Sequence, residues 1–433
     1  MADLPVASGP VASGRGRLAG TGLQLGAGLV TVGAAGYIFL AVAGNTLPSA
    51  DYAALAMLYL LINIIGPGLF IALEQETSRA VSARVAAGVP TGPTARAAAL
   101  LALGLFGILA VVVLAVSPVL TDRLFNGNPW LLVALLLGGA GAAAVFWVRG
   151  VLGGQRQFGG YAATILGEGL ARLLPTLLLP LMGLAAATSL GFSFAAGTVV
   201  AAAVTVPWLH RGGPGPREKL PPMARGMALL VTATLLSQLV ANLGPVVVGL
   251  RSSDVALVAT FASAVVLARI PLFLFSPVQV LLLPGLTRAA EVGDRRAVAI
   301  RIRQLLTAVA AFGLAAVAVT ALVGPNAVQV FFGAEIALPS AVLALLAASS
   351  VLFMAAYVLQ PALIALRRHR WVAVGWVAGA VVFLAVAVAP GSPVRAVVVA
   401  QLAGPAVVVA VMGTGLARAV SGHPRAAARA PVG

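Results

Sequence analysis

Two charged side chains lie in the middle of an apolar stretch, where charge is costly and therefore informative. Glu168 and Arg172 are four residues apart, so on a helix they share one face and can form an ion pair. A charge at the bilayer centre costs about 2.5–3.5 kcal/mol on insertion scales. The pair predicts either a structural link to a neighbouring helix or part of the wall of a hydrophilic cavity, and the sequence alone leaves both open.

A third intramembrane charge, Arg269, has no acidic residue within a helical turn. It directly precedes Ile270 and Pro271, and because proline interrupts helical hydrogen bonding, we expect the helix to kink or break there. An arginine beside such a break favours contact with water and an anionic ligand. The alternative is that its side chain extends to the cytoplasmic interface.

Four uncharged polar residues complete the candidate substrate-binding set: Gln24, Asn63, Gln238 and Asn242. Gln238 and Asn242 are one helical turn apart and are expected to share a face. Hydrogen bonding between helices is the more common role for such side chains inside membranes, so these candidates are weaker than the charged ones.

The composition explains why these few polar positions matter. The chain is 61% apolar and 9% charged, and its mean hydropathy is +1.06. An ordinary soluble domain carries about 25% charged residues, so this composition excludes a soluble enzyme. Cysteine is absent, which removes disulfides, thiolate metal sites and cysteine nucleophiles.

Twelve apolar stretches are long enough to span a bilayer, which takes about 20 residues of helix. They predict an all-α integral membrane protein. The stretches lie near 22–44, 52–73, 97–117, 129–148, 161–184, 188–209, 227–249, 256–284, 304–323, 337–364, 371–389 and 396–417.

The basic residues predict the orientation of these spans, because short cytoplasmic segments collect Lys and Arg. With both termini in the cytoplasm, only Arg123, Arg251 and Arg395 fall outside, and all other basic residues except Arg172 and Arg269 lie on the inner side. The net charge of +16 is therefore a topology signal, and nucleic-acid binding is disfavoured. Three inner arginines are candidates for gathering an anionic lipid substrate at the cytoplasmic entry: Arg79, Arg156 and Arg288.

A polar segment near the middle divides the predicted spans six plus six. Residues 210–226 form a cytoplasmic linker between an N-terminal lobe, 1–209, and a C-terminal lobe, 227–418, with a cytoplasmic tail at 419–433. Because six is even, both lobes enter the membrane in the same orientation, and any repeat is parallel. Ser-Ala-Asp at 49–51 and Ser-Ser-Asp at 252–254 are consistent with such a repeat, although helix capping explains them equally well.

Several chemistries are excluded or poorly supported. The only lysine, Lys219, stands between Glu218 and Leu220, so the chain contains no phosphate-binding P-loop. The histidines lack metal-ligand spacing, and we expect no metal and no cofactor. The predicted external loops are short, which argues against a membrane-embedded enzyme. We therefore expect a protein that is not an enzyme.

Three segments together resemble a known family. The stretch ALEQETSRAVSARVAAG (72–88) looks like the cytoplasmic exit of the second span in polysaccharide-type flippases of the multidrug/oligosaccharidyl-lipid/polysaccharide (MOP) exporter superfamily. Residues 148–174 resemble their R-G-x-L-x-G-x-x-x-F…E-x-x-x-R pattern, with Glu168 and Arg172 at the matching places. Residues 268–294 are similar to their arginine-proline eighth span.

This resemblance implies a flippase for lipid-linked glycans. Such a protein moves a polyprenyl-pyrophosphate-linked oligosaccharide from the inner to the outer leaflet by alternating access between two six-helix lobes. It implies an anionic glycan-lipid substrate, a place in the cytoplasmic (inner) membrane, and cell-envelope glycan assembly enzymes, including those of polysaccharide or lipopolysaccharide biosynthesis, as candidate partners. The arginines Arg172 and Arg269 are then the available contacts for a pyrophosphate headgroup.

Three other functions stay open at this point. A cation-coupled multidrug exporter of the same superfamily needs a cavity carboxylate, and Glu168 is the one deep acid that the sequence indicates, next to a neutralising Arg172. A membrane-embedded glycan polymerase or transferase needs an external acid such as Asp122 or Glu335. A scaffold of a cell-envelope assembly complex needs none of these residues.

Overall fold

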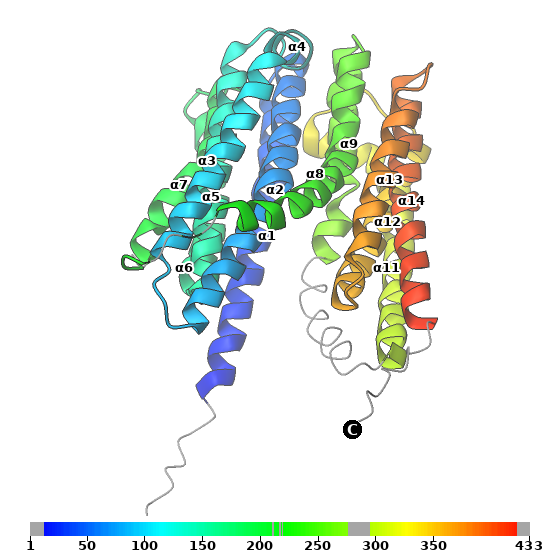
Figure 1. Ribbon diagram of the computed structural model, residues 1–433. Coiled ribbons are helices and arrows are strands. Elements are labelled where there is room, and N and C mark those ends of the chain that lie inside the picture. Colours follow the sequence, from blue (N-terminus) through cyan, green and yellow to red (C-terminus); the bar gives the residue numbers. More distant parts are fainter. Residues whose placement is uncertain (1–12, 210–211, 216–217, 219, 276–294, 422–433) are drawn as a thin grey trace, which may run out of the picture. The chain divides into compact units, whose positions relative to one another are not determined.

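The computed structural model describes residues 13–209, 212–215, 218, 220–275 and 295–421, and this part of the chain is helical with no strand. The helices are α1 (Ser13–Thr46), α2 (Ser49–Ala86), α3 (Gly92–Ala115), the short α4 (Ser117–Val119), the π-helix η1 (Leu120–Leu124), α5 (Pro129–Gly154), α6 (Phe158–Leu181), α7 (Ala187–Thr205), the 3-10 helix η2 (Val206–Trp208), α8 (Leu220–Arg251), α9 (Val255–Leu267), α11 (Arg295–Phe332), α12 (Ser340–Ala365), α13 (His369–Ala387) and α14 (Pro393–Ser421). Figure 1 shows them in chain order.

The long helices match the predicted membrane spans. Within the described residues, 11 helices are long and apolar enough to cross a membrane, and Val30–Thr46 of α1 is a shorter apolar segment. Each of the twelve predicted stretches falls wholly or in part on one of these helices, so the predicted all-α architecture with about twelve spans is confirmed. The orientation of the spans stays a prediction.

The chain packs as two compact units. Unit 1 comprises residues 1–46, 69–118 and 128–227, and unit 2 comprises 47–68, 119–127 and 228–433. These units do not coincide with the two lobes expected on either side of the linker 210–226, because the first half of α2 and the segment around η1 pack with unit 2. The boundary within α2 falls between Gly68 and Leu69, next to Pro67.

Unit 1 is built on close contacts between α1, α5, α6 and α7, with α3 against α5. Glycines allow two of these approaches. A Cβ on Gly169 of α6 would lie 2.8 Å from the Thr31 side chain of α1, and one on Gly141 of α5 would overlap the side chain of Thr198 on α7. These helices can pack tightly because the glycines lack a side chain, which places the middle of α6 in a dense interior.

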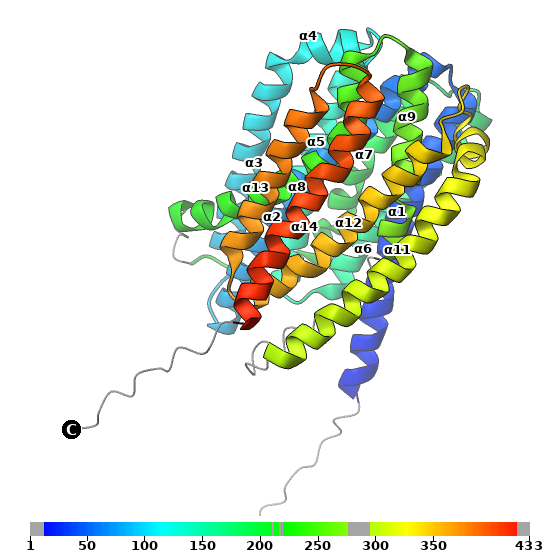
Figure 2. The ribbon, with the colours of Figure 1, turned by 90° about the vertical axis from the view of Figure 1, so that its right-hand side faces the viewer.

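Unit 2 packs α12, α13 and α14 side by side, as Figure 2 shows, and α11 lies against α12. Gly379 of α13 and Gly404 of α14 face each other, because a Cβ on either would lie about 3 Å from the backbone of the other. The largest fully buried side chain of this unit, Trp376, donates a hydrogen bond of 2.8 Å from Nε1 to Oε1 of Gln360. The indole N–H of this buried ring is therefore satisfied within the protein.

The break predicted at Arg269 is confirmed. Helix α9 ends at Leu267, residues 268 and 269 form a turn, and the helix resumes over 270–275. The segment 276–294, which carries the remainder of the predicted eighth span and most of the third resembling stretch, lies outside the described residues.

Candidate functional site

The middle of α6 carries the predicted ion pair. Glu168 and Arg172 lie one turn apart on this helix, and Arg172 Nη1 is 2.8 Å from Glu168 Oε1. Both residues are buried, at 6% and 7% exposure. The expected helical pair therefore exists and lies in the interior of unit 1.

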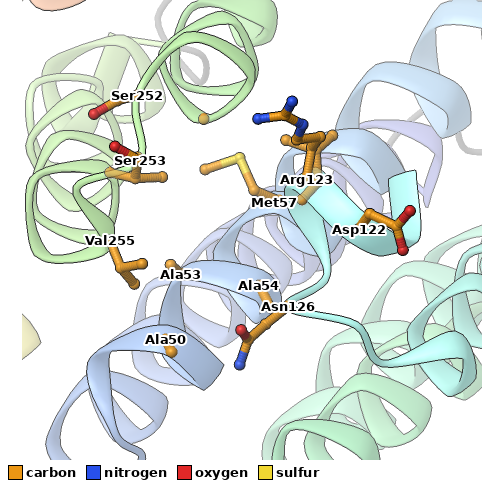
Figure 3. A pocket seen from close by; sticks show the side chains of 13 residues that line it. Ala50, Ala53, Ala54, Met57, Asp122, Arg123, Asn126, Ser252, Ser253 and Val255 are labelled. Carbon is orange, nitrogen blue, oxygen red and sulfur yellow. The ribbon is translucent and has the colours of Figure 1, made fainter. Parts of the chain in front are cut away.

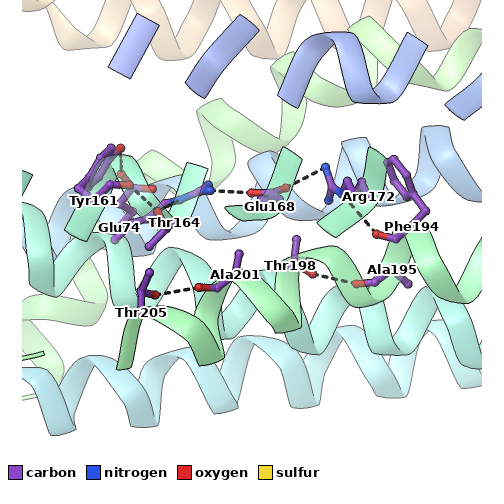
Figure 4. Close-up of polar contacts among 11 residues, drawn as sticks. Glu74, Tyr161, Thr164, Glu168, Arg172, Phe194, Ala195, Thr198, Ala201 and Thr205 are labelled. Carbon is purple, nitrogen blue, oxygen red and sulfur yellow. Dashed lines mark hydrogen bonds and ion pairs between the residues drawn. The ribbon is translucent and has the colours of Figure 1, made fainter. Parts of the chain in front are cut away.

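A second arginine completes the pair, and the sequence did not indicate it. Arg149 of α5 places Nη2 2.6 Å from Glu168 Oε2 and donates from Nε to the Thr164 hydroxyl at 2.9 Å. From the sequence, Arg149 was counted with the inner basic residues, but α5 continues to Gly154 and the residue is only 8% exposed. We refer to Arg149, Glu168 and Arg172 as the Glu168 triad (Figure 4).

Aromatic rings and backbone atoms support both guanidinium groups. The Arg172 guanidinium stacks 4.3 Å from the ring centre of Phe194 on α7, and its Nε donates to the Phe194 carbonyl at 3.3 Å. Arg149 lies 5.6 Å from the ring centre of Phe146. Gly197 of α7 leaves room for the Arg172 stem, since a Cβ there would lie 2.5 Å from Arg172 Cγ. Such contacts stabilise a buried cation.

The triad holds two guanidinium groups and one carboxylate. Both carboxylate oxygens of Glu168 are occupied by arginine, so this acid is not available to bind a cation. A second carboxylate, that of Glu74 on α2, is close enough to Arg149 to interact with it electrostatically. Arginine is also the residue best suited to a bidentate contact with phosphate. The arrangement is therefore chemically suited to an anionic ligand.

Unit 1 holds further acids on α2, so Glu168 is not its only inward-facing carboxylate. Tyr161 of α6 donates a hydrogen bond of 2.6 Å from its hydroxyl to Glu74 Oε1. Figure 4 shows Glu74, Tyr161 and Thr164 grouped at one end of the polar contacts and Arg172 with Phe194 at the other. Glu76, two residues on, is 4% exposed and pairs with Arg79 at 2.5 Å. The Glu-Gln-Glu sequence at 74–76 is the feature of the amino-acid sequence that could have indicated these two acids.

Unit 2 holds a second polar cluster at the end of α9. Arg269 donates from Nη1 to Asn242 Oδ1, and Asn242 donates from Nδ2 to Gln238 Oε1 at 2.9 Å. The predicted shared face of Gln238 and Asn242 on α8 is therefore confirmed, and it meets the predicted arginine. Gln401 of α14, which the sequence did not single out, is 1% exposed and donates to the carbonyl of Ala241 at 3.4 Å.

Of the other predicted site residues, those whose side chains the structure describes do not join these clusters. Asn63 is half-buried and donates to the carbonyl of Tyr59 in its own helix at 2.8 Å. Arg79 and Arg156 are exposed, and Arg156 adopts a φ of 59° in the turn after α5. Gln24 belongs to α1, but its side chain is not described, and Arg288 lies outside the described residues. The predicted entry role of the arginines stays a prediction.

In the part of the chain that the structure describes, no group of three or more His, Cys, Asp or Glu side chains is arranged to hold a metal ion.

Sequence comparison finds relatives across nearly the full length but no matching family model. The protein described as "Uncharacterized protein Rv1510" of Mycobacterium tuberculosis is 29% identical over 432 residues, covering 95% of this chain and 93% of the relative. "Uncharacterized protein Rv3630" of the same organism is 28% identical over 424 residues, covering 94% of each chain.

Solved structures reveal the class of fold. An inward-facing multidrug resistance MATE family transporter of the MOP superfamily matches with a TM-score of 0.70 at 14% identity, covering 90% of this chain and 94% of the other. A variant of the Vibrio cholerae MATE transporter VcmN matches at 0.64 and 13%, covering 94% and 96%. A Pyrococcus furiosus MOP superfamily transporter, described as having a binding pocket of reverse polarity, matches at 0.61 and 14%, covering 91% and 96%. The chain is a multi-pass membrane protein with the fold of MATE transporters of the MOP superfamily.

Proposed function

We propose that this protein is a transporter that moves a polyprenyl-pyrophosphate-linked glycan precursor to the outer leaflet of the cytoplasmic membrane. The single observation that supports this best is the Glu168 triad, in which two buried arginines share one carboxylate. A diphosphate headgroup is an anion that matches the spare guanidinium donors. The fold of MATE transporters makes transport, rather than catalysis, the expected activity.

In this proposal Glu168 is an internal counter-anion for the empty transporter. It keeps Arg149 and Arg172 hydrogen-bonded while no ligand is present, which limits the cost of burying them. A diphosphate that approaches the triad competes with Glu168 for the guanidinium groups. In unit 2, Arg269 and the two amides of Gln238 and Asn242 offer a second set of polar contacts for the same headgroup or its sugars. Two units that each hold a polar cluster suit alternating access.

The test is mass spectrometry of polyprenyl-linked glycans in a strain that lacks the protein, combined with an impermeant probe for glycan exposed on the outer leaflet. We expect a finished lipid-linked oligosaccharide to accumulate on the cytoplasmic side, and the accumulated glycan would identify the cargo. Re-expression of the wild-type chain should restore exposure. An unchanged lipid pool with normal outer exposure would refute the proposal.

A second candidate, a cation-coupled multidrug exporter, is favoured by one observation. Glu74 is a half-buried acid that accepts its hydrogen bond from the neutral Tyr161 hydroxyl rather than from an arginine. Such a carboxylate could exchange a proton against a cationic drug. The same deletion strain should then become sensitive to cationic dyes, and Glu74→Gln, but not Arg156→Gln, should fail to restore resistance. A strain with unaltered dye sensitivity would exclude this candidate.

A further inference from the structure

A pocket of about 190 Å³ lies within unit 2, and its lining includes no residue of either polar cluster. Its walls come from the start of α2, the π-helix η1 with the turn after it, the end of α8 and the start of α9. In the predicted topology these ends face the outer side of the membrane. This space is enough for a phosphate or diphosphate group.

The wall of the pocket has one cationic group and two hydroxyl groups opposite it. Arg123 of η1 extends its guanidinium beside Met57, and Ser252 and Ser253 stand across the pocket (Figure 3). Within the described residues Arg123 is exposed and makes no hydrogen bond or ion pair. Its five N–H donors are therefore available, and a guanidinium fork beside hydroxyl groups is a typical contact for a phosphate oxygen.

Three aspartates near the pocket could oppose an anion, but each is engaged or directed elsewhere. Asp51 accepts a hydrogen bond from Asn126 at 3.5 Å. Asp254 caps α9 and accepts from the backbone N–H of Leu257 at 3.0 Å. The carboxylate of Asp122 points away from the Arg123 guanidinium (Figure 3). Asp122 is itself a lining residue, and Arg123 is the cationic side chain of the lining.

The backbone that presents Arg123 is irregular. Arg123 belongs to a π-helix of five residues, a conformation that occurs frequently at functional sites. Asn126, two residues after its end, adopts a φ of 51°, which is uncommon outside glycine, and Gly127 follows with a φ of 73°. The starts of α2 and α9 also lie at the pocket, and helix starts favour anions. These backbone features support an anion site, but the main observations are the Arg123 side chain and the pocket beside it.

We propose that this pocket binds a phosphate-type anion at the outer face, with Arg123 as the principal contact and Ser252 and Ser253 as hydrogen-bond donors. The anion has two chemically equivalent sources, the diphosphate of a polyprenyl lipid and the phosphate of a bilayer phospholipid. The proposal concerns binding alone and does not depend on the proposed transport function.

The test uses the full chain purified in an uncharged detergent and titrated with inorganic pyrophosphate by isothermal titration calorimetry. We expect saturable binding that Arg123→Gln weakens about tenfold or more, as losing charge-assisted hydrogen bonds implies. Arg123→Lys should retain part of the affinity, because it keeps the charge but not the fork. The matched control is Arg395→Gln, an exposed arginine that is also predicted to lie outside, which should bind like the wild type.

Two further arms identify the source of the anion. The protein is placed in phosphatidylcholine nanodiscs containing either undecaprenyl diphosphate or phosphatidylglycerol, and retained lipid is counted by native mass spectrometry. Arg123-dependent retention of either lipid supports the proposal and names the source. Absence of pyrophosphate binding, or equal losses in the Arg123 and Arg395 variants, would overturn it. Because neither readout measures flipping, failure of the proposed function would leave this result intact.

Discussion

Arg149 of α5 and Glu168 of α6 are joined by an ion pair of 2.6 Å in the interior of unit 1, 19 residues apart along the chain. The same carboxylate also holds Arg172 through its other oxygen. This relationship links two helices through one acid that pairs with two arginines.

Replacing Arg149 should destabilise the protein. Arg149→Gln removes hydrogen bonds to Glu168 and Thr164 in a buried site, and bonds to charged groups contribute about 1.5–3 kcal/mol each to the free energy of unfolding. Thermal unfolding in detergent measures this loss as a lower midpoint. Arg156→Gln, which changes the charge equally at an exposed position, should stay within about 0.5 kcal/mol of the wild type. Equal midpoints for both variants would contradict the structure.

Single and double replacements should separate pairing from ligand contact. Arg172→Met alone leaves Glu168 with a single arginine, and we expect lower stability as well as lost transport. Glu168 keeps its ion pair with Arg149 in this variant, whereas adding Glu168→Gln also takes the paired carboxylate away from Arg149, so the midpoint of thermal unfolding should fall further. Normal glycan exposure on the outer leaflet in the Arg172→Met protein would show that the pair is structural and that Arg172 does not contact the ligand.

The cluster in unit 2 should be needed for transport more than for folding. Arg269 lies in a turn after α9, and its Nη1 donates to Asn242. We expect Arg269→Ala to reduce outer-leaflet glycan exposure strongly, with a normal amount of protein in the membrane. Arg395→Ala is the comparison for loss of an arginine elsewhere in unit 2. Normal glycan exposure in the Arg269 variant would remove this residue from the site.

Gly197 should be intolerant of a side chain. A Cβ at this position would lie 2.5 Å from Cγ of Arg172, so Gly197→Ala forces the arginine stem to shift, and overpacking costs typically about 1–3 kcal/mol. Gly104→Ala on α3 is the matched control, because nothing lies within 4 Å of the Cβ that the alanine would add, and it should be neutral or stabilising. Thermal unfolding of the two variants compares them directly, and a neutral Gly197→Ala would refute the close contact.

One ion pair at the end of unit 1 should make stability depend on pH. The Thr94 hydroxyl and Arg84 both donate to Glu218, at 2.7 and 2.9 Å, and these hydrogen bonds lower the pKa of Glu218 below its ordinary value of 4.5. Because the pKa is lower in the folded state, this stabilisation is present above pH 4.5 and is lost as the pH falls through the folded-state pKa.

The measurement for this prediction is the thermal midpoint of the wild type and of Glu218→Gln between about pH 7 and about pH 3. We expect the wild type to be the more stable at neutral pH and the difference to shrink below pH 4.5. Arg84→Gln should reduce the same difference, because it removes one of the two donors. A constant difference across this range would mean that Glu218 does not titrate as described.

The sequence by itself determined the helical membrane architecture. The length and apolarity of each span follow from the requirement that a chain in lipid satisfies its own backbone hydrogen bonds, so the twelve spans could be predicted from local composition. The Glu168–Arg172 pair and the break at Arg269 were also local, since helical spacing and proline act within a few residues.

Only the tertiary structure decided which distant residues meet. Arg149 was counted with the inner basic residues because it stands near the end of an apolar stretch, and only the packing of α5 against α6 shows that it is buried beside Glu168. The pairing of Asn242 with Arg269 and the pocket around Arg123 likewise join segments far apart in the chain. Composition and periodicity report on one helix at a time, whereas contacts between helices depend on which faces pack together.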